Sequence, residues 1–460
     1  MILNFVKGIG RLALRKIANE GGIFLNYVIR ELSPIAFKFR DFGITMVQDN
    51  IGDPIKAGVK VEGWIKKIIL DTAEDDRSMG YSSEAEGEAS ARDFVAQHRN
   101  SRKGVKISLE DVIFASGSSP IISEINSRLS EQGILLVPSP GYPAHSSYQA
   151  FNLGRNAVYY KLDPSNKWLP NLEDIKRTLE AYNYMVKGII VINPGNPTGA
   201  VFPQSIIRGL VDICDEYGVL PIFDECYANT VYGGTEFVHL GDVIGGAPGI
   251  SLRSMSKDVP WPGGRCGWME AYNQEKHEHL KEFFEIIRQS FRQQASSTTL
   301  PQLALPKIYG DERFSKHLQE WNYQLEIAAD MRINHLKEIA GLSVVRPQGA
   351  FYMAPIFEDG FLNESQELPV MNCSRRDEAE NYLKSLLSQE PNLNLDKRLV
   401  YNLMANGIFV VPLTGFGPHY HGFRVTTLNP NIEQVDATYA RLKELISQYQ
   451  NSTNVRGAWI

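Results

Sequence analysis

Short apolar runs rich in β-branched residues alternate with amphipathic stretches between about residues 105 and 255. The runs that predict strands are Val112–Ala115, Ile134–Val137, Gly188–Ile192, Val219–Phe223 and Ile250–Leu252. The stretches that predict helices between them include Pro120–Gln132, Asn171–Tyr182 and Gln204–Tyr217. This alternation predicts an α/β fold with a mostly parallel sheet covered by helices on both faces. Chemically active side chains are then expected just past the carboxyl ends of the strands.

A second pattern follows towards the C-terminus. A long helix is predicted from about Asp311 to Ala340, with Gly341 as its C-cap. Shorter strand-like runs come after it, at Leu342–Val345, Ala350–Met353, Ile408–Val411 and Phe423–Thr426. They predict a smaller α+β domain. We therefore expect three parts: an N-terminal segment over residues 1–50, a large domain over 51–325 and a small domain over 326–460.

Composition narrows the class of protein. The 460 residues are 43% hydrophobic and 22% charged, as in an ordinary globular protein of two or three domains. The net charge of −6 gives no reason to expect nucleic acid as a partner. No apolar run approaches the roughly 18–20 residues of a membrane-spanning helix. The four cysteines form no CxxC pair and no metal-ligand spacing, which predicts free thiols in a reducing cytoplasm and no metal site.

The first 32 residues are basic and amphipathic, with one acidic residue before Glu31. Such a segment is compatible with an organelle-targeting or membrane-surface helix. It lacks the uninterrupted apolar stretch of a secretory signal. We favour a helix docked on the body of the protein, and expect residues 1–50 to pack on the small domain or on a partner subunit.

Three motifs follow predicted strands or lie in a Gly-rich loop. They are Asn193–Gly199 (NPGNPTG), Asp224–Tyr227 (DECY) and Ser254–Lys257 (SMSK), the last followed eight residues on by Arg265. A buried carboxylate at a strand end needs a cation or a protonated ring nitrogen beside it. Pyridoxal phosphate requires a lysine, an acidic partner for its pyridine nitrogen and donors for its phosphate. All three residue types are present.

With these motifs the sequence resembles the class I/II aminotransferases of fold type I, from Asp49 to the C-terminus. The resemblance implies that Lys257 binds pyridoxal 5'-phosphate covalently. It implies that Arg265 binds the phosphate through its planar guanidinium, and that the hydroxyls of Ser254 and Ser256 add donors. Residues 51–325 would then form the cofactor-binding domain, and residues 326–460 the domain that closes on the substrate.

Further cofactor contacts follow from the resemblance. The turn formed by Ser116, Gly117, Ser118 and Ser119 opens a predicted helix, whose backbone N–H groups suit a phosphate, although Ser and Gly there are also ordinary capping residues. Tyr142 corresponds to the aromatic residue that stacks on the cofactor ring. Asn196 and Tyr227 correspond to the residues that hydrogen-bond its phenolic oxygen. Asp224 corresponds to the carboxylate that keeps the pyridine nitrogen protonated.

The resemblance also implies a substrate site and a dimer. Gly52, in Ile51–Pro54 (IGDP), would let the backbone approach the substrate carboxylate, and Arg424 would bind that carboxylate with two hydrogen bonds. Tyr81 corresponds to a tyrosine that reaches the phosphate in the neighbouring subunit, so the active unit is expected to be a homodimer with shared active sites.

Two regions depart from the family pattern. Leucine stands at position 413, where relatives commonly have glycine, and His419, Tyr420 and His421 precede Arg424. We expect Leu413, His419 and Tyr420 to line the pocket for the substrate side chain. The segment Phe357–Leu395 is longer than is usual in the family, and the sequence does not predict its role.

The predicted function is transfer of an amino group between an L-amino acid and a 2-oxo acid, with Lys257 as the base that moves the Cα proton. Lys257, Asp224 and Tyr227 are the expected catalytic residues. A lyase or decarboxylase that uses the same cofactor stays open as an alternative. A transcription regulator on the same fold is disfavoured, because no helix-turn-helix pattern precedes the first motif.

Overall fold

The computed structural model describes residues 19–25, 27–371, 373–389, 392–429 and 431–452. Residues 1–18, which hold most of the basic N-terminal segment, lie outside the described residues. Within these ranges, no helix has the length and apolar character to cross a membrane. No group of His, Cys, Asp and Glu side chains in the same ranges is arranged to hold a metal ion.

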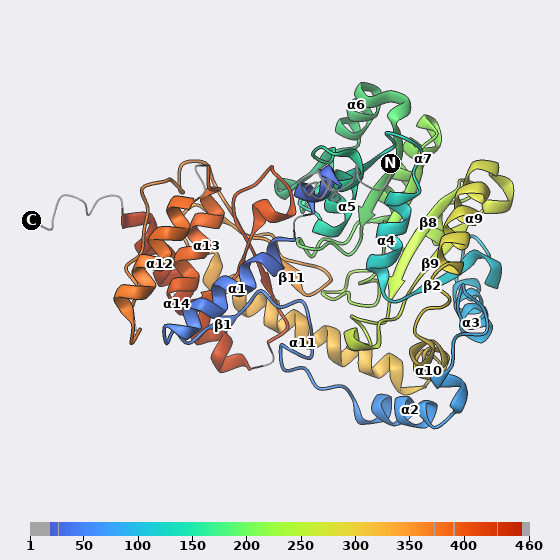
Figure 1. Cartoon of the computed structure of the whole chain (residues 1–460), viewed down its shortest axis with the longest axis horizontal. Coiled ribbons are helices and arrows are strands. Elements are labelled where there is room, and N and C mark those ends of the chain that lie inside the picture. Colours follow the sequence, from blue (N-terminus) through green and yellow to red (C-terminus); the bar gives the residue numbers. More distant parts are fainter. Residues whose placement is uncertain (1–18, 26, 372, 390–391, 430, 453–460) are drawn as a thin grey trace, which may run out of the picture.

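The large domain is built on an eight-stranded sheet (Figure 1). In spatial order its strands are β2 (Val112–Ala115), β9 (Gly267–Tyr272), β8 (Gly249–Ser254), β7 (Leu220–Asp224), β6 (Val186–Ile192), β3 (Ile134–Ser139), β4 (Tyr159–Asp163) and β5 (Leu169–Pro170). The run from β8 to β4 is parallel, whereas β9 and β5 pair antiparallel with their neighbours. The predicted α/β class and all five predicted strands are confirmed.

Three strands of this sheet, β4, β5 and β9, were not predicted. In β9 all six residues are buried, yet Glu270 interrupts the apolar run that would have marked it. In β4 buried and more exposed side chains alternate, as expected near the edge of a sheet. Strands β9 and β4 form by pairing with neighbouring strands, and the pattern of a single segment does not predict such pairing.

Helices cover both faces of the sheet. One face packs against α4 (Ser118–Ser127), α5 (Pro143–Leu153) and α9 (Glu278–Arg292). The other face packs against α3 (Ala89–Asn100), α6 (Leu172–Tyr182), α7 (Gln204–Tyr217), α8 (Leu240–Val243) and α10 (Thr299–Tyr309). Most side chains inside the sheet are apolar on both faces, with buried polar exceptions such as Arg253 on β8 and Glu270 on β9. A further helix, α2 (Gly63–Ala73), packs on α10.

Helix α11 (Arg313–Leu336) runs from the large domain into the C-terminal part of the chain (Figure 1). It ends five residues before Gly341, so the predicted C-cap is wrong, and Lys337 takes that place. The chain leaves the helix through tighter turns, in which Ile339 N–H donates to Leu336 O and Leu342 N–H to Ile339 O. Gly341, with φ of +67°, belongs to the turn that leads into the next strand.

The C-terminal part combines three helices with two small sheets. The helices are α12 (Arg376–Gln389), α13 (Leu395–Ala405) and α14 (Ile432–Asn451). One sheet joins β11 (Tyr352–Met353), β15 (Phe423–Thr426) and β14 (Val411–Pro412), and the other joins β10 (Leu342–Ser343) and β12 (Ile356–Phe357). All pairs in both sheets are antiparallel.

The N-terminal segment touches both parts of the molecule. The short helix η2 (Glu20–Phe24) lies on α5, whereas α1 (Val28–Asp41) packs on α13 and β14. Strand β1 (Val47–Gln48) pairs with β13 (Ile408–Phe409). In the long segment Phe357–Leu395, Tyr382 of α12 packs edge-on against Phe39 of α1. We keep the division at residues 50 and 325 as a proposal; the second boundary lies inside α11.

Candidate active site

A cavity of about 780 Å³ opens at the carboxyl ends of β6, β7 and β8 and is bounded on its other sides by α1 and β15. Most of the predicted site residues line it, although they are spread over the chain. They are Gly52, Ser118, Ser119, Tyr142, Asn196, Asp224, Tyr227, Ser254, Ser256, Lys257, Arg265 and Arg424. The fold therefore brings the three sequence motifs to one place, as expected for parallel strands whose ends meet at one edge.

Lys257 lies in the turn that follows β8. Its Nζ donates a hydrogen bond to the carbonyl oxygen of Gly52 at 3.0 Å. The same nitrogen lies 5.6 Å from the ring centroid of Tyr227 and 5.4 Å from that of Phe351. No carboxylate forms an ion pair with Lys257 in the described ranges. Its amine therefore faces the cavity with a single carbonyl partner.

Asp224 is the last residue of β7 and is buried. Its Oδ2 lies 3.1 Å from Nε2 of His145, and its Oδ1 accepts from the backbone N–H of Cys226 at 3.1 Å. Burial alone raises the pKa of Asp224. The hydrogen bond and charge of His145, with the hydrogen bonds from Cys226, outweigh burial and hold the pKa below its ordinary value. The carboxyl group is therefore ionised at neutral pH.

A second part of the cavity is rich in hydrogen-bond donors. Helix α4 begins at Ser118, and its N-cap Gly117 has φ of +94°, where a side chain would be strained. A Cβ there would lie 2.5 Å from Nη2 of Arg265, and this Nη2 donates to Ser116 O at 3.0 Å. Ser116 and Gly117 thus lie behind Arg265 and do not line the cavity. Together the helix N-terminus, the hydroxyls and the guanidinium suit a phosphate.

Arg424, on β15, is 1% exposed. Its Nη1 donates to Oδ1 of Asn196 at 3.3 Å, and its Nη2 donates to the carbonyl oxygen of Asn50 at 2.7 Å. Its guanidinium carbon lies 4.3 Å from the ring centroid of Tyr352. The buried Nε has no hydrogen-bond partner. A buried cation held only by neutral groups is suited to bind an anionic group that enters the cavity.

Two tyrosines of the cavity, Tyr142 and Tyr227, are neutral. The hydroxyl of Tyr227 donates to that of Tyr352 at 3.3 Å, and burial raises its pKa well above the ordinary value. Burial and the neighbouring Tyr27 likewise raise the pKa of Tyr142. The rings of Tyr27 and Tyr142 meet edge to face with centroids 6.2 Å apart. Gly52 lies against Tyr352, whose hydroxyl oxygen would be 2.2 Å from a Cβ at position 52.

Some predicted residues lie elsewhere. Tyr81 is 82% exposed and does not line the cavity. Contrary to expectation, Leu413, His419 and Tyr420 do not line the pocket. The loop instead docks on the large domain: Nδ1 of His419 lies 2.8 Å from Oγ of Ser139, and the Tyr420 hydroxyl donates to the carbonyl oxygen of Leu162 at 2.6 Å.

The sequence reasoning missed three residues of the site, His145, Tyr352 and Asn50. His145 lies in the first turn of α5, just after the predicted turn at Tyr142, which was its only signal. Tyr352 lies within a predicted strand, and Asn50 directly precedes the predicted Ile51–Pro54 signature. Their roles depend on contacts between distant segments, and a lone His, Tyr or Asn carries no such information.

The described residues fit pyridoxal phosphate. A lysine amine, an ionised buried carboxylate and a group of donors for a dianion occur in one cavity, and these are the three functions that the cofactor requires. The buried Nε of Arg424 and Oδ1 of Asn50 both lack partners, which leaves polar atoms at the same cavity for a bound substrate. The site is thus suited to amino-acid chemistry.

Comparison with known proteins agrees with this site. The sequence model named "Aminotransferase class I and II" matches residues 50–442. The chain therefore belongs to the class I and II aminotransferase family and is an enzyme that transfers amino groups. It is 39% identical, over 94% of its length and 98% of the relative's, to an uncharacterised aminotransferase of Methanocaldococcus jannaschii.

Two relatives with more specific names are more distant in sequence. The chain is 24% identical to the glutamate-pyruvate aminotransferase of Escherichia coli, over 90% of this chain and 93% of that protein. The solved structure of an alanine aminotransferase from Pyrococcus furiosus superposes with a TM-score of 0.80 at 26% identity. That match covers 94% of this chain and 100% of the other. The fold is therefore shared along nearly the whole length.

Proposed function

We propose that this aminotransferase uses pyridoxal phosphate, held by Lys257, to move an amino group between an L-amino acid and a 2-oxo acid. The observation that carries the proposal is the single cavity that contains the Lys257 amine, the Asp224 carboxylate and the Arg424 guanidinium. When bound, pyridoxal phosphate withdraws electrons from the Cα of the substrate, so that the Cα proton becomes acidic.

The roles of the side chains follow from their positions. Arg424 binds the α-carboxylate of the substrate and thereby orients Cα towards Lys257. The amine of Lys257 then accepts the Cα proton and later returns a proton to the product. Asp224 would stabilise the positive charge on the pyridine nitrogen of the cofactor. Tyr142 would hold its ring, and Asn196 and Tyr227 would bind its phenolic oxygen.

The phosphate of the cofactor is assigned to the donor-rich part of the cavity. The N-terminus of α4 supplies the backbone N–H groups and hydroxyls of Ser118 and Ser119, with Ser116 and Gly117 supporting the turn. The hydroxyls of Ser254 and Ser256 and the guanidinium of Arg265 complete the set. A dianion is favourable there because an α-helix N-terminus and a cation face the same space.

For the substrate we propose a dicarboxylate such as glutamate or 2-oxoglutarate on one side of the reaction. Three exposed cations, Arg30, Arg40 and Lys56, lie on the cavity wall. None of them forms an ion pair with a carboxylate in the described part of the chain. They therefore offer a positive partner for a second carboxylate. The E. coli relative, named for glutamate and pyruvate, suggests alanine and pyruvate as the other pair.

Reduction by borohydride tests the cofactor assignment. The purified protein should be yellow, and reduction should fix the cofactor on the peptide that contains Ser254–Arg265, at Lys257. Lys257→Ala should lose both covalent cofactor and transamination. Labelling of another lysine would contradict the assignment. A screen of donors against 2-oxo-acid acceptors separates the proposed reaction from that of a lyase or decarboxylase, because only transamination requires the acceptor.

We further propose a homodimer with shared active sites and a location in the cytoplasm. The exposure of Tyr81 supports a role in a neighbouring subunit, because this large aromatic side chain is 82% exposed in a single chain. All four cysteines are free thiols, as is usual in a reducing compartment. Sedimentation of the native enzyme tests the dimer. Tyr81→Phe should weaken cofactor binding without dissociating the dimer.

A further inference from the structure

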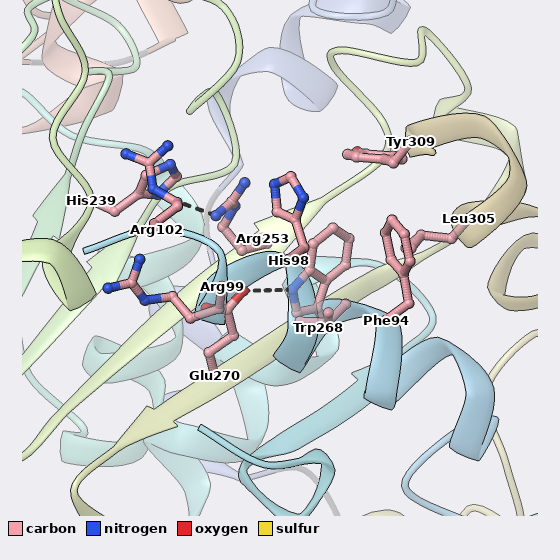
Figure 2. A pocket seen from close by; sticks show the side chains of 11 residues that line it. Phe94, His98, Arg99, Arg102, His239, Arg253, Trp268, Glu270, Leu305 and Tyr309 are labelled. Atoms are coloured by element: carbon pink, nitrogen blue, oxygen red, sulfur yellow. Dashed lines mark hydrogen bonds between the residues drawn. The ribbon is translucent and has the colours of Figure 1, made fainter. Parts of the chain in front are cut away.

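The residues that directly follow Asp224 and Lys257 are themselves buried carboxylates. Glu225 is 0% exposed and Asp258 is 5% exposed. Neither lines the active-site cavity. Both instead contact a buried polar cluster behind the site, between β8, β9, α3 and α10 (Figure 2): Glu225 through His239, and Asp258 through Tyr309. In each of the pairs Asp224–Glu225 and Lys257–Asp258, the first side chain therefore faces the active-site cavity and the second faces away from it.

Glu225 fixes the end of β7. Its backbone N–H donates to the carbonyl oxygen of Leu252, on β8, at 2.9 Å. Its carboxylate accepts from Leu240 N–H at 2.7 Å and lies 3.0 Å from Nδ1 of His239. These contacts join the loop that carries Asp224 to β8 and to the start of α8.

Asp258 fixes the turn that carries Lys257. Its carboxylate accepts hydrogen bonds from the Tyr309 hydroxyl at 3.0 Å and from Nδ2 of Asn229 at 2.5 Å. Its carbonyl oxygen lies 2.8 Å from Nε2 of His317. The turn is thereby tied to α10 and α11 and to the loop after Tyr227.

Arg253, on β8, lies in this cluster together with His239 and Tyr309, the partners of the two carboxylates (Figure 2). Its Nη1 lies 3.9 Å from Oε2 of Glu225 and donates to Nδ1 of His239 at 3.2 Å. Its guanidinium carbon lies 5.9 Å from the ring centroid of Trp268, the residue opposite it on β9. The positive charge of Arg253 acts electrostatically on Glu225, Asp258 and Glu270.

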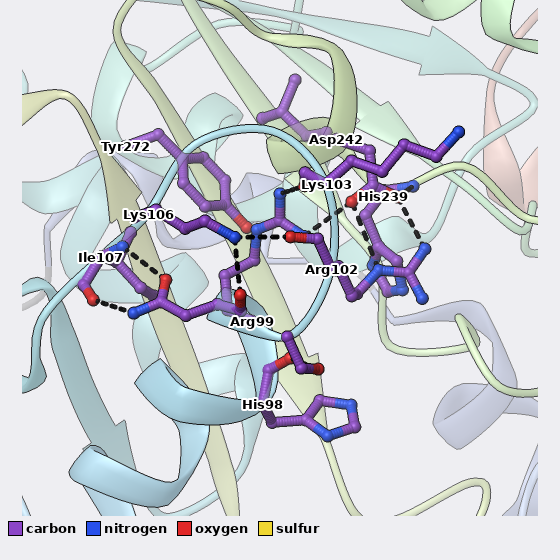
Figure 3. Close-up of polar contacts among 12 residues, drawn as sticks. His98, Arg99, Arg102, Lys103, Lys106, Ile107, His239, Asp242 and Tyr272 are labelled. Atoms are coloured by element: carbon purple, nitrogen blue, oxygen red, sulfur yellow. Dashed lines mark hydrogen bonds and ion pairs between the residues drawn. The ribbon is translucent and has the colours of Figure 1, made fainter.

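A second set of ion pairs lies beside the cluster (Figure 3). Asp242 of α8 accepts from Nη1 of Arg99 at 2.6 Å and from Nη2 of Arg102 at 2.6 Å. Arg99 is 3% exposed, so this pair lies at the boundary of the interior. Arg253 itself is 8% exposed, so solvent screens its charge weakly and that charge acts over a longer range than at a surface.

We propose that Arg253 is a positioning residue of the aminotransferase reaction, which holds Asp224 and Lys257 in register through the buried carboxylates of Glu225 and Asp258. The proposal rests on the proposed use of pyridoxal phosphate at this site. Without Arg253, the carboxylates of Glu225, Asp258 and Glu270 would lose the buried cation that acts on all three, which favours their displacement or protonation. Either change moves the strand ends from which the two catalytic side chains project.

Arg253→Met tests the proposal, with Arg253→Lys as the conservative variant. The readout is the visible circular dichroism of the bound cofactor at pH 8, since this signal depends on how the site orients the ring. We expect Arg253→Met to reduce the ellipticity per bound cofactor at least about twofold and kcat at least about tenfold, with KM changed less than about threefold. Arg253→Lys should recover at least half of the lost ellipticity.

Arg92→Met is the matched control. Like Arg253, Arg92 is buried; it lies on α3 and is 1% exposed. It pairs with Glu84 and does not border the cluster. It should lower stability without changing the ellipticity of the bound cofactor. If Arg253→Met retains the wild-type ellipticity and kcat, the proposal is wrong.

Two further variants keep the test informative if Arg253→Met does not fold. Glu225→Gln and Asp258→Asn remove one carboxylate each at nearly constant volume. Both should reduce the ellipticity per bound cofactor, and normal signals from both would overturn the proposal. A wild-type protein that binds no cofactor would instead overturn the proposed function, so the two failures are distinguishable.

Discussion

Nε2 of His145 lies 3.1 Å from Oδ2 of Asp224, and both side chains are buried. Since this contact opposes the effect of burial, His145→Leu should raise the pKa of Asp224. The Asp224 carboxylate would then become protonated when the pH falls through this higher pKa. The acidic limb of the kcat profile should therefore move to higher pH. A profile that does not move would contradict this assignment.

Arg424→Lys should weaken the binding of all donors and acceptors alike. The charge remains, but the planar two-point contact with the α-carboxylate is lost. We expect a loss of about 1.5–3 kcal/mol in kcat/KM for every substrate, the range for hydrogen bonds to charged groups. Arg441→Lys, on α14, is the control, because Arg441 donates to Asn406 O away from the cavity. An effect on one donor only would exclude the carboxylate role.

Arg30→Gln should discriminate between substrates. If Arg30 binds the second carboxylate of glutamate, kcat/KM for glutamate should fall about tenfold, whereas that for alanine should change less than about threefold. Lys38→Gln removes a charge from the same helix at a position that lies over Phe42 and does not line the cavity. Equal losses for glutamate and alanine would show that Arg30 does not select the dicarboxylate.

Tyr420→Phe should affect domain contact and leave substrate choice unchanged. The hydroxyl donates to Leu162 O, and the ring meets Trp168 edge to face at 5.3 Å. Loss of the hydrogen bond should cost about 1 kcal/mol of stability. The ranking of donors by kcat/KM should stay as in the wild type. A changed ranking would restore the sequence-based expectation that this loop lines the substrate pocket.

Glu225 should make stability depend on pH. Burial raises its pKa to about 7, against the opposing charges of Arg253 and Arg99, with Asp242 acting in the same direction as burial. Because the pKa of Glu225 is higher in the folded chain than in the unfolded chain, its contribution to the stability of the fold is complete below the unfolded-state pKa. This contribution is lost as the pH rises through about 7. In the Glu225→Gln variant, the amide at position 225 does not ionise.

Its stability relative to the wild type should therefore improve by about 3 kcal/mol between pH 4.5 and 8, from the size of the pKa shift. Urea unfolding at several pH values measures the difference. A constant difference across this range would show that Glu225 keeps an ordinary pKa in the folded protein.

The alternation of apolar strands and amphipathic helices determined the fold class, because burial on both faces of a parallel sheet leaves a continuous apolar run in each strand. The motifs at Asn196, Asp224 and Lys257 directly follow such runs, so the sequence also placed them at one edge of the sheet. Strand β9 was not predicted because a glutamate, Glu270, interrupts its apolar run. Glu270 is tolerated in the interior because Trp268 Nε1 and the Tyr272 hydroxyl donate hydrogen bonds to its carboxylate.

Tertiary structure alone decided which groups act on these residues. His145 meets Asp224 across 79 residues, and Arg424 meets Asn196 across 228. The loop at His419 and Tyr420, close to Arg424 in sequence, docks on the large domain instead of lining the cavity. Sequence patterns record which face of an element is buried, whereas a polar contact depends on the relative placement of two elements, to which no local pattern refers.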